Sequence, residues 1–220
     1  MIKSATFKFL KEVSENNDRD WFKLHKNEYD NALQNVLDFT AALITALSKT
    51  DPTVPANLDP KACVMRIYRD VRFSKDKVPY KTNFGIAISA NGKNFKGPGY
   101  YIHLQPGASF IAAGSWFPEK EELKCIRQEI DYNASDWHEI IDDTDFKKLF
   151  GDLHQEGKLQ TAPKGYDADN PEIEYLKLKS FTVGKKLTDK ELTASGSVES
   201  VASLFEKLYP FIIFLRSAIS

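Results

Sequence analysis

The residues best equipped for chemistry are a run of cations in the middle of the chain. They are Arg66, Arg69, Arg72, Lys75, Lys77 and Lys81. Arginine donates hydrogen bonds in a planar fork that matches phosphate and carboxylate groups. Because the run begins on a predicted strand and continues into a loop, its side chains can converge on one ligand at a strand end. We therefore predict a basic, anion-binding surface, with Tyr80 as an aromatic anchor.

The charge around this run is strongly asymmetric. Between Lys61 and Pro118 there are nine Lys and Arg residues, including Lys93 and Lys96, against two Asp, a net charge of +7. The rest of the chain holds 21 basic and 29 acidic residues, a net charge of −8. No Asp or Glu occurs from Lys77 through Pro118, so counter-charge must come from distant helices or from an anionic ligand.

A structural interpretation of the same cations stays open. Arg69 and Arg72 lie close in sequence to Asp70 and Asp76, and the four could form ion pairs that hold the loop to the sheet. Replacing both arginines by Gln separates the two interpretations, because only the structural one requires a large fall in stability.

A second group of candidates lies on the predicted strand that follows. Tyr101, His103 and Gln105 share one face, and the other face is more apolar. His103 is our candidate catalytic residue, because surrounding positive charge favours its neutral form, which can act as a base. The alternative is a structural histidine, since no nucleophile or carboxylate partner is visible in the sequence. We predict Tyr101 and His103 as ligand-binding residues beside the cations.

Several classes of site lack support. The four His show no HxH or HxxxH spacing and the two Cys no CxxC spacing, so we predict no metal, no cofactor and no disulfide framework. Cys63 and Cys125 are expected to be buried thiols. Phosphate-loop, dinucleotide and esterase motifs are absent, and the Gly97-Pro98-Gly99 and Pro106-Gly107 segments are better explained as turns.

The periodicity of apolar residues predicts an α+β fold, a central antiparallel sheet flanked by N-terminal and C-terminal helices. We expect one domain over residues 1–220. Residues 4–48 are expected to form N-terminal helices with a break near Asn27. Residues 61–114 form the sheet region, which starts with a strand at Cys63–Ile67. Residues 118–220 form further helices and a final strand at about 176–181. Thr188–Glu191 fits a capping box, and the last helix is expected to kink or restart at Pro210.

Four stretches carry a family resemblance. They are FLKEVSENNDRDWFKLHKNEY at 9–29, MRIYRDVRFSKDKVPYKTN at 65–83, PGYYIHLQPGASFIAAGSWFP at 98–118 and APKGYDADNPEIEYLKLKSF at 162–181. Together they resemble a widespread bacterial family of conserved hypothetical proteins, domain of unknown function 2461, over nearly the whole chain. The name of that family states no activity, so the resemblance implies no reaction.

Three functions therefore remain open. The first is a binder, or an enzyme, of a phosphorylated or carboxylated small molecule. The second is a nucleic-acid-binding module that stacks bases on its aromatic residues. The sequence pI near 6.4 argues against this function, because dedicated nucleic-acid binders are usually basic overall. Its stacking residues would be Tyr68, Phe73, Tyr80, Phe95, Tyr100 and Tyr101. The third is a scaffold that docks an acidic partner. The first 13 residues lack a secretory signal, and no stretch is apolar enough to span a bilayer. We therefore expect a cytoplasmic protein without membrane contact. The sequence leaves the oligomeric state open.

Overall fold

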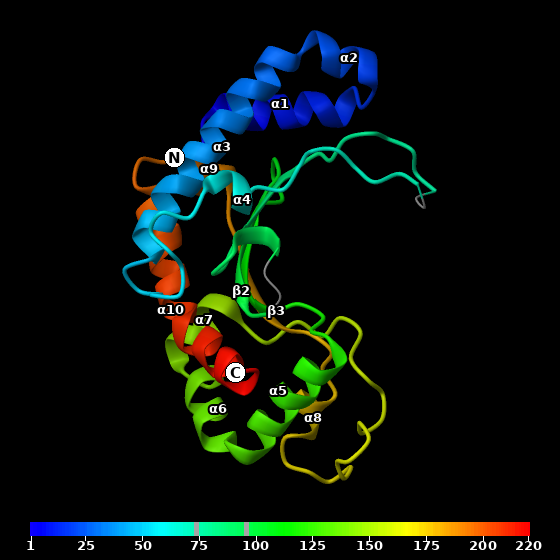
Figure 1. Cartoon of the computed structure of the whole chain (residues 1–220), viewed down its shortest axis with the longest axis vertical. Helices are drawn as coiled ribbons and strands as arrows, with labels where there is room; N and C mark the ends of the chain where they lie inside the picture. Colours follow the sequence, from blue (N-terminus) through cyan, green and yellow to red (C-terminus); the bar gives the residue numbers. More distant parts are fainter. Residues whose placement is uncertain (73–74, 95–96) are drawn as a thin grey trace. The chain divides into compact units, whose positions relative to one another are not determined.

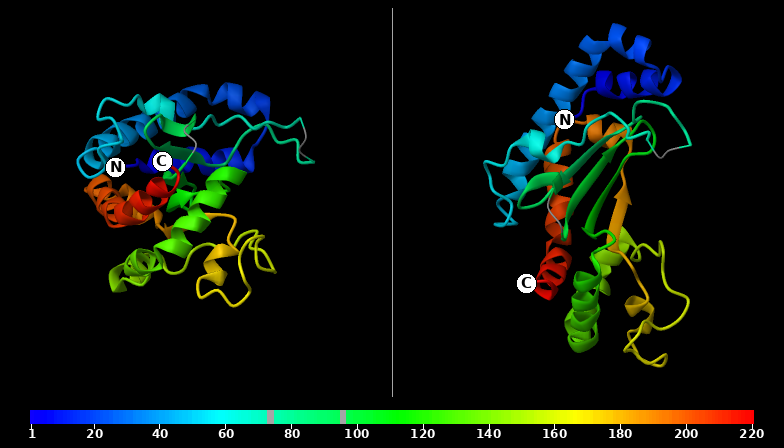
Figure 2. Two further views of the ribbon diagram at one scale, coloured as in Figure 1. Left: turned by 60° about the horizontal axis from the view of Figure 1, so that its bottom comes forward. Right: turned by 45° about the vertical axis from the view of Figure 1, so that its right-hand side comes forward.

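The computed structural model, which describes residues 1–72, 75–94 and 97–220, contains a four-stranded antiparallel sheet. Its strands are β1 (Phe84–Ile88), β2 (Gly99–Leu104), β3 (Phe110–Ser115) and β4 (Phe181–Lys186), in the order β1-β2-β3-β4. Figure 2 shows the strands side by side. Along β2 the buried residues alternate with half-buried ones, which confirms the two faces predicted for this strand. The predicted α+β class is confirmed as well.

The N-terminal helices are α1 (Ser4–Glu15), α2 (Arg19–Leu24), α3 (Lys26–Leu47) and the short α4 (Pro60–Cys63) (Figure 1). The Asp18 side chain caps α2 by accepting hydrogen bonds from the backbone N–H groups of Asp20 and Trp21. The predicted break falls at His25, between α2 and α3. Buried side chains recur along α3 at three- and four-residue intervals, as expected for a helix with one face in the core.

The remaining helices follow β1, β3 and β4. They are the 3₁₀ turn η1 (Gly92–Asn94), α5 (Lys120–Tyr132), α6 (Ala134–Ile141), α7 (Thr144–Phe150), α8 (Ile173–Leu176), α9 (Asp189–Thr193) and α10 (Ser197–Ala218). The predicted capping box of Thr188 and Glu191 is confirmed at the start of α9. α10 continues through Pro210 as one helix. None of the helices in the described part of the chain combines the length and apolar character that a bilayer crossing requires.

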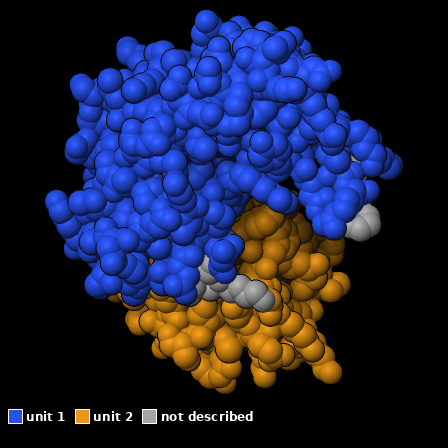
Figure 3. Space-filling model, turned by 45° about the horizontal axis from the view of Figure 1, so that its top comes forward, with its two compact units in different colours: residues 1–95, 101–111, 186–206 blue, residues 96–100, 112–185, 207–220 orange. Residues whose placement is uncertain are grey.

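Internal contacts group the chain into two compact units (Figure 3). Unit 1 comprises residues 1–95, 101–111 and 186–206, and unit 2 comprises residues 96–100, 112–185 and 207–220. Every residue predicted for the anion site belongs to unit 1. The organisation of residues 1–220 as one domain stays a prediction.

Three local predictions are wrong. The strand expected at Cys63–Ile67 is replaced by the end of α4 and an extended segment with an isolated bridge from Val64 to Ile86. The last strand begins only at Phe181, because the alternating residues before it include α8.

The third concerns the two thiols. Cys63 is buried as expected, and burial raises its pKa to about 11, but Cys125 is exposed. Helix α5 turns only Ile126 and Ile130 fully into the core, and the neighbouring thiol lies outside that stripe.

Candidate functional site

The predicted cations lie on an extended arm that continues from the edge of the sheet. We define the arm as residues 64–72 and 75–83, which form its two limbs (Figure 1). Backbone pairing joins Met65 to Gly85, Ile67 to Lys81, Tyr68 to Tyr80 and Arg69 to Pro79. Because of this register, residues from opposite limbs face each other although they are far apart in sequence.

The base of the arm is fastened to the N-terminal helices by Asn17. Its side-chain Nδ2 donates to the Tyr80 carbonyl at 2.9 Å, and the Tyr80 backbone N–H donates to Asn17 Oδ1 at 3.0 Å. The Tyr80 ring also stacks on Phe22, with 3.9 Å between ring centroids. Nothing in the local sequence around Asn17 indicates this contact, because the two partners are 63 residues apart.

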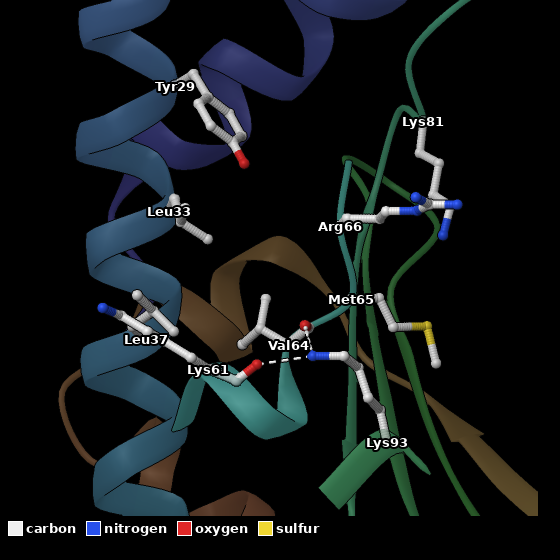
Figure 4. A pocket seen from close by; sticks show the side chains of 9 residues that line it. All are labelled: Tyr29, Leu33, Leu37, Lys61, Val64, Met65, Arg66, Lys81 and Lys93. Atoms are coloured by element: carbon white, nitrogen blue, oxygen red, sulfur yellow. Dashed lines mark hydrogen bonds between the residues drawn. The ribbon is translucent and has the colours of Figure 1, made fainter. Parts of the chain in front are cut away.

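A hollow of about 460 Å³ lies between α3 and the base of the arm, and we call it the basic hollow. Its lining residues are Tyr29, Leu33, Leu37, Lys61, Val64, Met65, Arg66, Lys81 and Lys93 (Figure 4). Four of these nine are cationic and none is acidic. The apolar residues come from α3 and the first limb. The hollow therefore combines an apolar wall with an excess of positive charge, an arrangement suited to an organic anion.

Arg66 and Lys81 place two cations next to each other at this hollow. In Figure 4 the ends of the two side chains lie side by side. The pKa of Lys81 lies below its ordinary value, first because the side chain is partly buried and second because the Arg66 charge is close. Neither side chain forms a hydrogen bond or an ion pair with any other described residue. Hydrogen bonds from Arg72 lower the pKa of Asp70, and the more remote Arg66 charge contributes less.

Lys93 has a structural role in the same hollow. Its Nζ donates to the carbonyl oxygens of Lys61, at 2.7 Å, and Val64, at 3.0 Å (Figure 4). These carbonyls lie at the end of α4, where cations are favourable. The charge of Lys93 is thus largely engaged, in contrast to those of Arg66 and Lys81.

The four charged residues named in the structural interpretation form two ion pairs with one another in the outer part of the arm. Arg69 pairs with Asp76 at 2.7 Å and Arg72 with Asp70 at 2.6 Å. The hydrogen bond from Arg69 lowers the pKa of Asp76. Arg69 and Tyr80 line a second hollow of the arm, whereas three other predicted cations line neither hollow: Arg72, Lys75 and Lys77. The cationic run therefore does not converge as one group, and only Arg66 and Lys81 meet at the basic hollow.

Tyr101 and His103 lie on β2 and form a hydrogen-bonded row. His103 Nδ1 lies 3.2 Å from Tyr101 Oη and 3.4 Å from Asn83 Nδ2, and His103 Nε2 lies 2.8 Å from Gln105 Oε1. These partners fit a ring that donates from Nε2 to Gln105 and accepts at Nδ1. The imidazole also stacks on Phe110, at 4.8 Å between centroids. With both nitrogens and one face engaged, the geometry favours the structural alternative for His103.

Tyr101 is also connected to the wall of the basic hollow. A Cβ on Gly85 would lie 2.9 Å from Tyr101 Oη and 3.0 Å from the Met65 sulfur, so both side chains lie over this glycine. Met65 lines the hollow, and burial raises the pKa of Tyr101. The Tyr101 hydroxyl therefore stays protonated next to the lining of the hollow.

The aromatic residues proposed for stacking bases differ in exposure. Tyr68 is 46% exposed, whereas Tyr100 is only 2% exposed and belongs to the core, so the stacking role predicted for Tyr100 is wrong. One face of Tyr80 is covered by Phe22. Two other predicted stacking residues, Phe73 and Phe95, and the cation Lys96 lie outside the described residues.

Unit 2 contains a separate cluster of titratable groups around His138 on α6. His138 Nδ1 lies 2.7 Å from Asp142 Oδ2, and Nε2 lies 2.9 Å from Glu172 Oε2. The hydrogen bond with Asp142 raises the pKa of His138, and Glu172 adds to this while burial opposes it. Asp142 is also paired with Lys147, at 2.7 Å. Nowhere in the described ranges do three or more His, Cys, Asp or Glu side chains gather as they would around a metal ion.

Fold and site together define an α+β protein with a basic hollow between a long helix and the edge of an antiparallel sheet. The chain matches the family described as Conserved hypothetical protein (DUF2461) over residues 5–214, and it belongs to that family. No curated protein and no solved structure matches the chain.

Proposed function

We propose that the protein binds a small organic anion, phosphorylated or carboxylated, in the basic hollow. Arg66 supplies the planar donor fork and Lys81 supplies a second, adjacent charge. The proposal concerns binding and assigns no reaction, and His103 is not part of it because its ring nitrogens already have partners.

One observation carries this proposal. The side-chain ends of Arg66 and Lys81 lie side by side at the basic hollow (Figure 4), and neither has a carboxylate partner among the described residues. The pKa of Lys81 is lowered first by burial and second by the Arg66 charge. Two adjacent like charges raise the energy of the folded protein, and a bound anion would turn that repulsion into two favourable contacts. The apolar side chains of Leu33, Leu37 and Met65 offer surface for the organic part of the ligand.

Titration calorimetry of the whole chain with phosphate, pyrophosphate and citrate tests the proposal. We expect saturable binding of at least one of these anions, and a loss of affinity of about tenfold or more in Arg66→Gln and in Lys81→Gln. A charge-assisted hydrogen bond is worth about 1.5–3 kcal/mol, which corresponds to a factor of about 10 to 150.

Lys75→Gln is the matched control, since it removes the same charge from the arm at a residue that does not line the hollow. Its affinity should stay within about twofold of the original. The proposal fails if the unaltered protein binds none of the three anions. It also fails if all three variants weaken binding equally, because the effect would then reflect net charge alone.

A further inference from the structure

The arm carries a second hollow that the proposed anion site does not use. It has a volume of about 380 Å³ and is lined by Arg19, Tyr68, Arg69, Val71, Pro79 and Tyr80. We call it the aryl hollow. Arg19 lies in the first turn of α2, and the other five residues lie on the two limbs of the arm. All six belong to unit 1, as does the whole lining of the basic hollow.

The aryl hollow has the composition of a site for a flat ring. Tyr68 is 46% exposed although it contacts the rings of Phe22 and Tyr80 at its other side, so part of its ring is open to a ligand. Arg19 is exposed and forms no hydrogen bond or ion pair with the described residues. Arg69 contributes a second guanidinium, which Asp76 holds in place. Guanidinium groups both stack on aromatic rings and donate to the polar edges of nucleobases.

The two hollows are neighbours along the arm. Arg66 and Tyr68 are both exposed while Ile67 between them is buried, so the two side chains project from the same face, roughly 6.6 Å apart along the extended chain. On the other limb, Lys81 lines the basic hollow and the preceding Tyr80 lines the aryl hollow.

A third link between the hollows is the pair Tyr29 and Tyr68. Tyr29 points from α3 into the basic hollow (Figure 4), and its pKa is raised by burial and, second, by the nearby Tyr68 hydroxyl. A single ligand can therefore reach both hollows.

We propose that this ligand is a mononucleotide, whose base stacks on Tyr68 in the aryl hollow while its phosphate contacts Arg66 and Lys81 in the basic hollow. This inference rests on the proposed anion site and names its ligand class. A mononucleotide is favoured over an oligonucleotide because Tyr68 is the one exposed stacking ring of the described arm, and because Tyr80 is covered by Phe22.

The test compares adenosine 5′-monophosphate, uridine 5′-monophosphate and ribose 5-phosphate as ligands of the whole protein. Stacking of one base makes each nucleotide bind about tenfold tighter than ribose 5-phosphate. Tyr68→Leu and, independently, Arg19→Gln should reduce this advantage to about threefold or less without changing the affinity for ribose 5-phosphate. Lys81→Gln should weaken all three ligands alike. Arg19 is exposed at a helix start, so its variant keeps the test decisive if Tyr68→Leu does not fold.

Three results would overturn the inference. Equal affinities for nucleotides and ribose 5-phosphate would remove the base from the site and leave the anion site intact. No binding of any of the three, together with no binding of pyrophosphate, would mean that the anion site itself is wrong. Binding of a ten-residue single-stranded RNA at least a hundredfold tighter than either nucleotide, with a steep salt dependence, would assign the arm to nucleic acid instead.

Discussion

Substitution of Gly114 by Ala should strongly destabilise the protein. Gly114 lies in β3 with φ +126°, a conformation that L residues rarely adopt. A Cβ built on it would lie 2.0 Å from the Phe181 carbonyl oxygen of β4 and 3.0 Å from the Thr182 Cα. The obstacle is backbone on both counts, so no side chain can rotate away, and the two strands must separate.

The expected cost combines two effects. Backbone strain at such a φ is worth about 1–3 kcal/mol, and forcing extra volume into a packed region costs about 1–3 kcal/mol more. We therefore expect the free energy of unfolding to fall by about 3 kcal/mol or more, a large part of the roughly 5–15 kcal/mol typical of a domain. Urea unfolding followed by tryptophan fluorescence measures this difference.

Gly107→Ala is the matched control for backbone strain without overlap. Gly107 also has a positive φ, +70°, but an added Cβ would have no atom within 4 Å. Its cost should be only about 1–2 kcal/mol, the penalty for an L residue in the left-handed region. If the two variants unfold at the same urea concentration, the inference that the close approach of β3 and β4 excludes a methyl group at Gly114 is wrong.

Three further predictions concern the arm and the cluster around His138. Asn17→Ala should lower the free energy of unfolding by about 1–3 kcal/mol, because the backbone N–H and carbonyl groups of Tyr80 both lose their partner. Asn16→Ala, at an exposed neighbour, should lower it by under about 0.5 kcal/mol in the same urea assay. In anion-free buffer, Lys81→Gln should leave the free energy of unfolding unchanged or raise it by a few tenths of a kcal/mol, because one of two neighbouring like charges is removed. A fall of more than about 1 kcal/mol would show instead that Lys81 has a structural partner. The raised pKa of His138 means that the folded state binds the His138 proton more tightly than the unfolded state does. The resulting stabilisation is complete below the unfolded pKa of about 6.5 and is lost as pH rises through the folded pKa. The free energy of unfolding of His138→Gln should lack that decline, and a pH profile identical to that of the unaltered protein would contradict this prediction.

Local patterns allowed the sheet and most helices to be predicted. β2 and the helix-capping residues of α9 depend on side chains within a few positions, so their period and spacing carry the information. The Cys63–Ile67 segment also alternates, yet it contains only one isolated bridge, from Val64 to Ile86, because its pairing depends on distant Gly85 and Ile86. Alternation alone could not distinguish that edge from a regular strand.

The site was predicted only in part, for the same reason. The cationic run was visible, but which of its members meet depends on the register of the two limbs, and the sequence does not contain that register in any local signal. Asn17, Arg19 and Tyr29 come from the N-terminal helices, and only the tertiary structure brings them to the arm.

The distribution of acidic residues explains why Arg66 and Lys81 have no ion pair among the described residues. The two aspartates of this segment, Asp70 and Asp76, hydrogen-bond Arg72 and Arg69 in the outer part. From Lys77 to Pro118 the chain has no further carboxylate, so the local sequence cannot neutralise Arg66 and Lys81. Lys81 also directly follows Tyr80, whose backbone N–H and carbonyl groups are both bound by Asn17. Two adjacent charges without an ion pair at the lining of a hollow are the arrangement expected of a preorganised anion site.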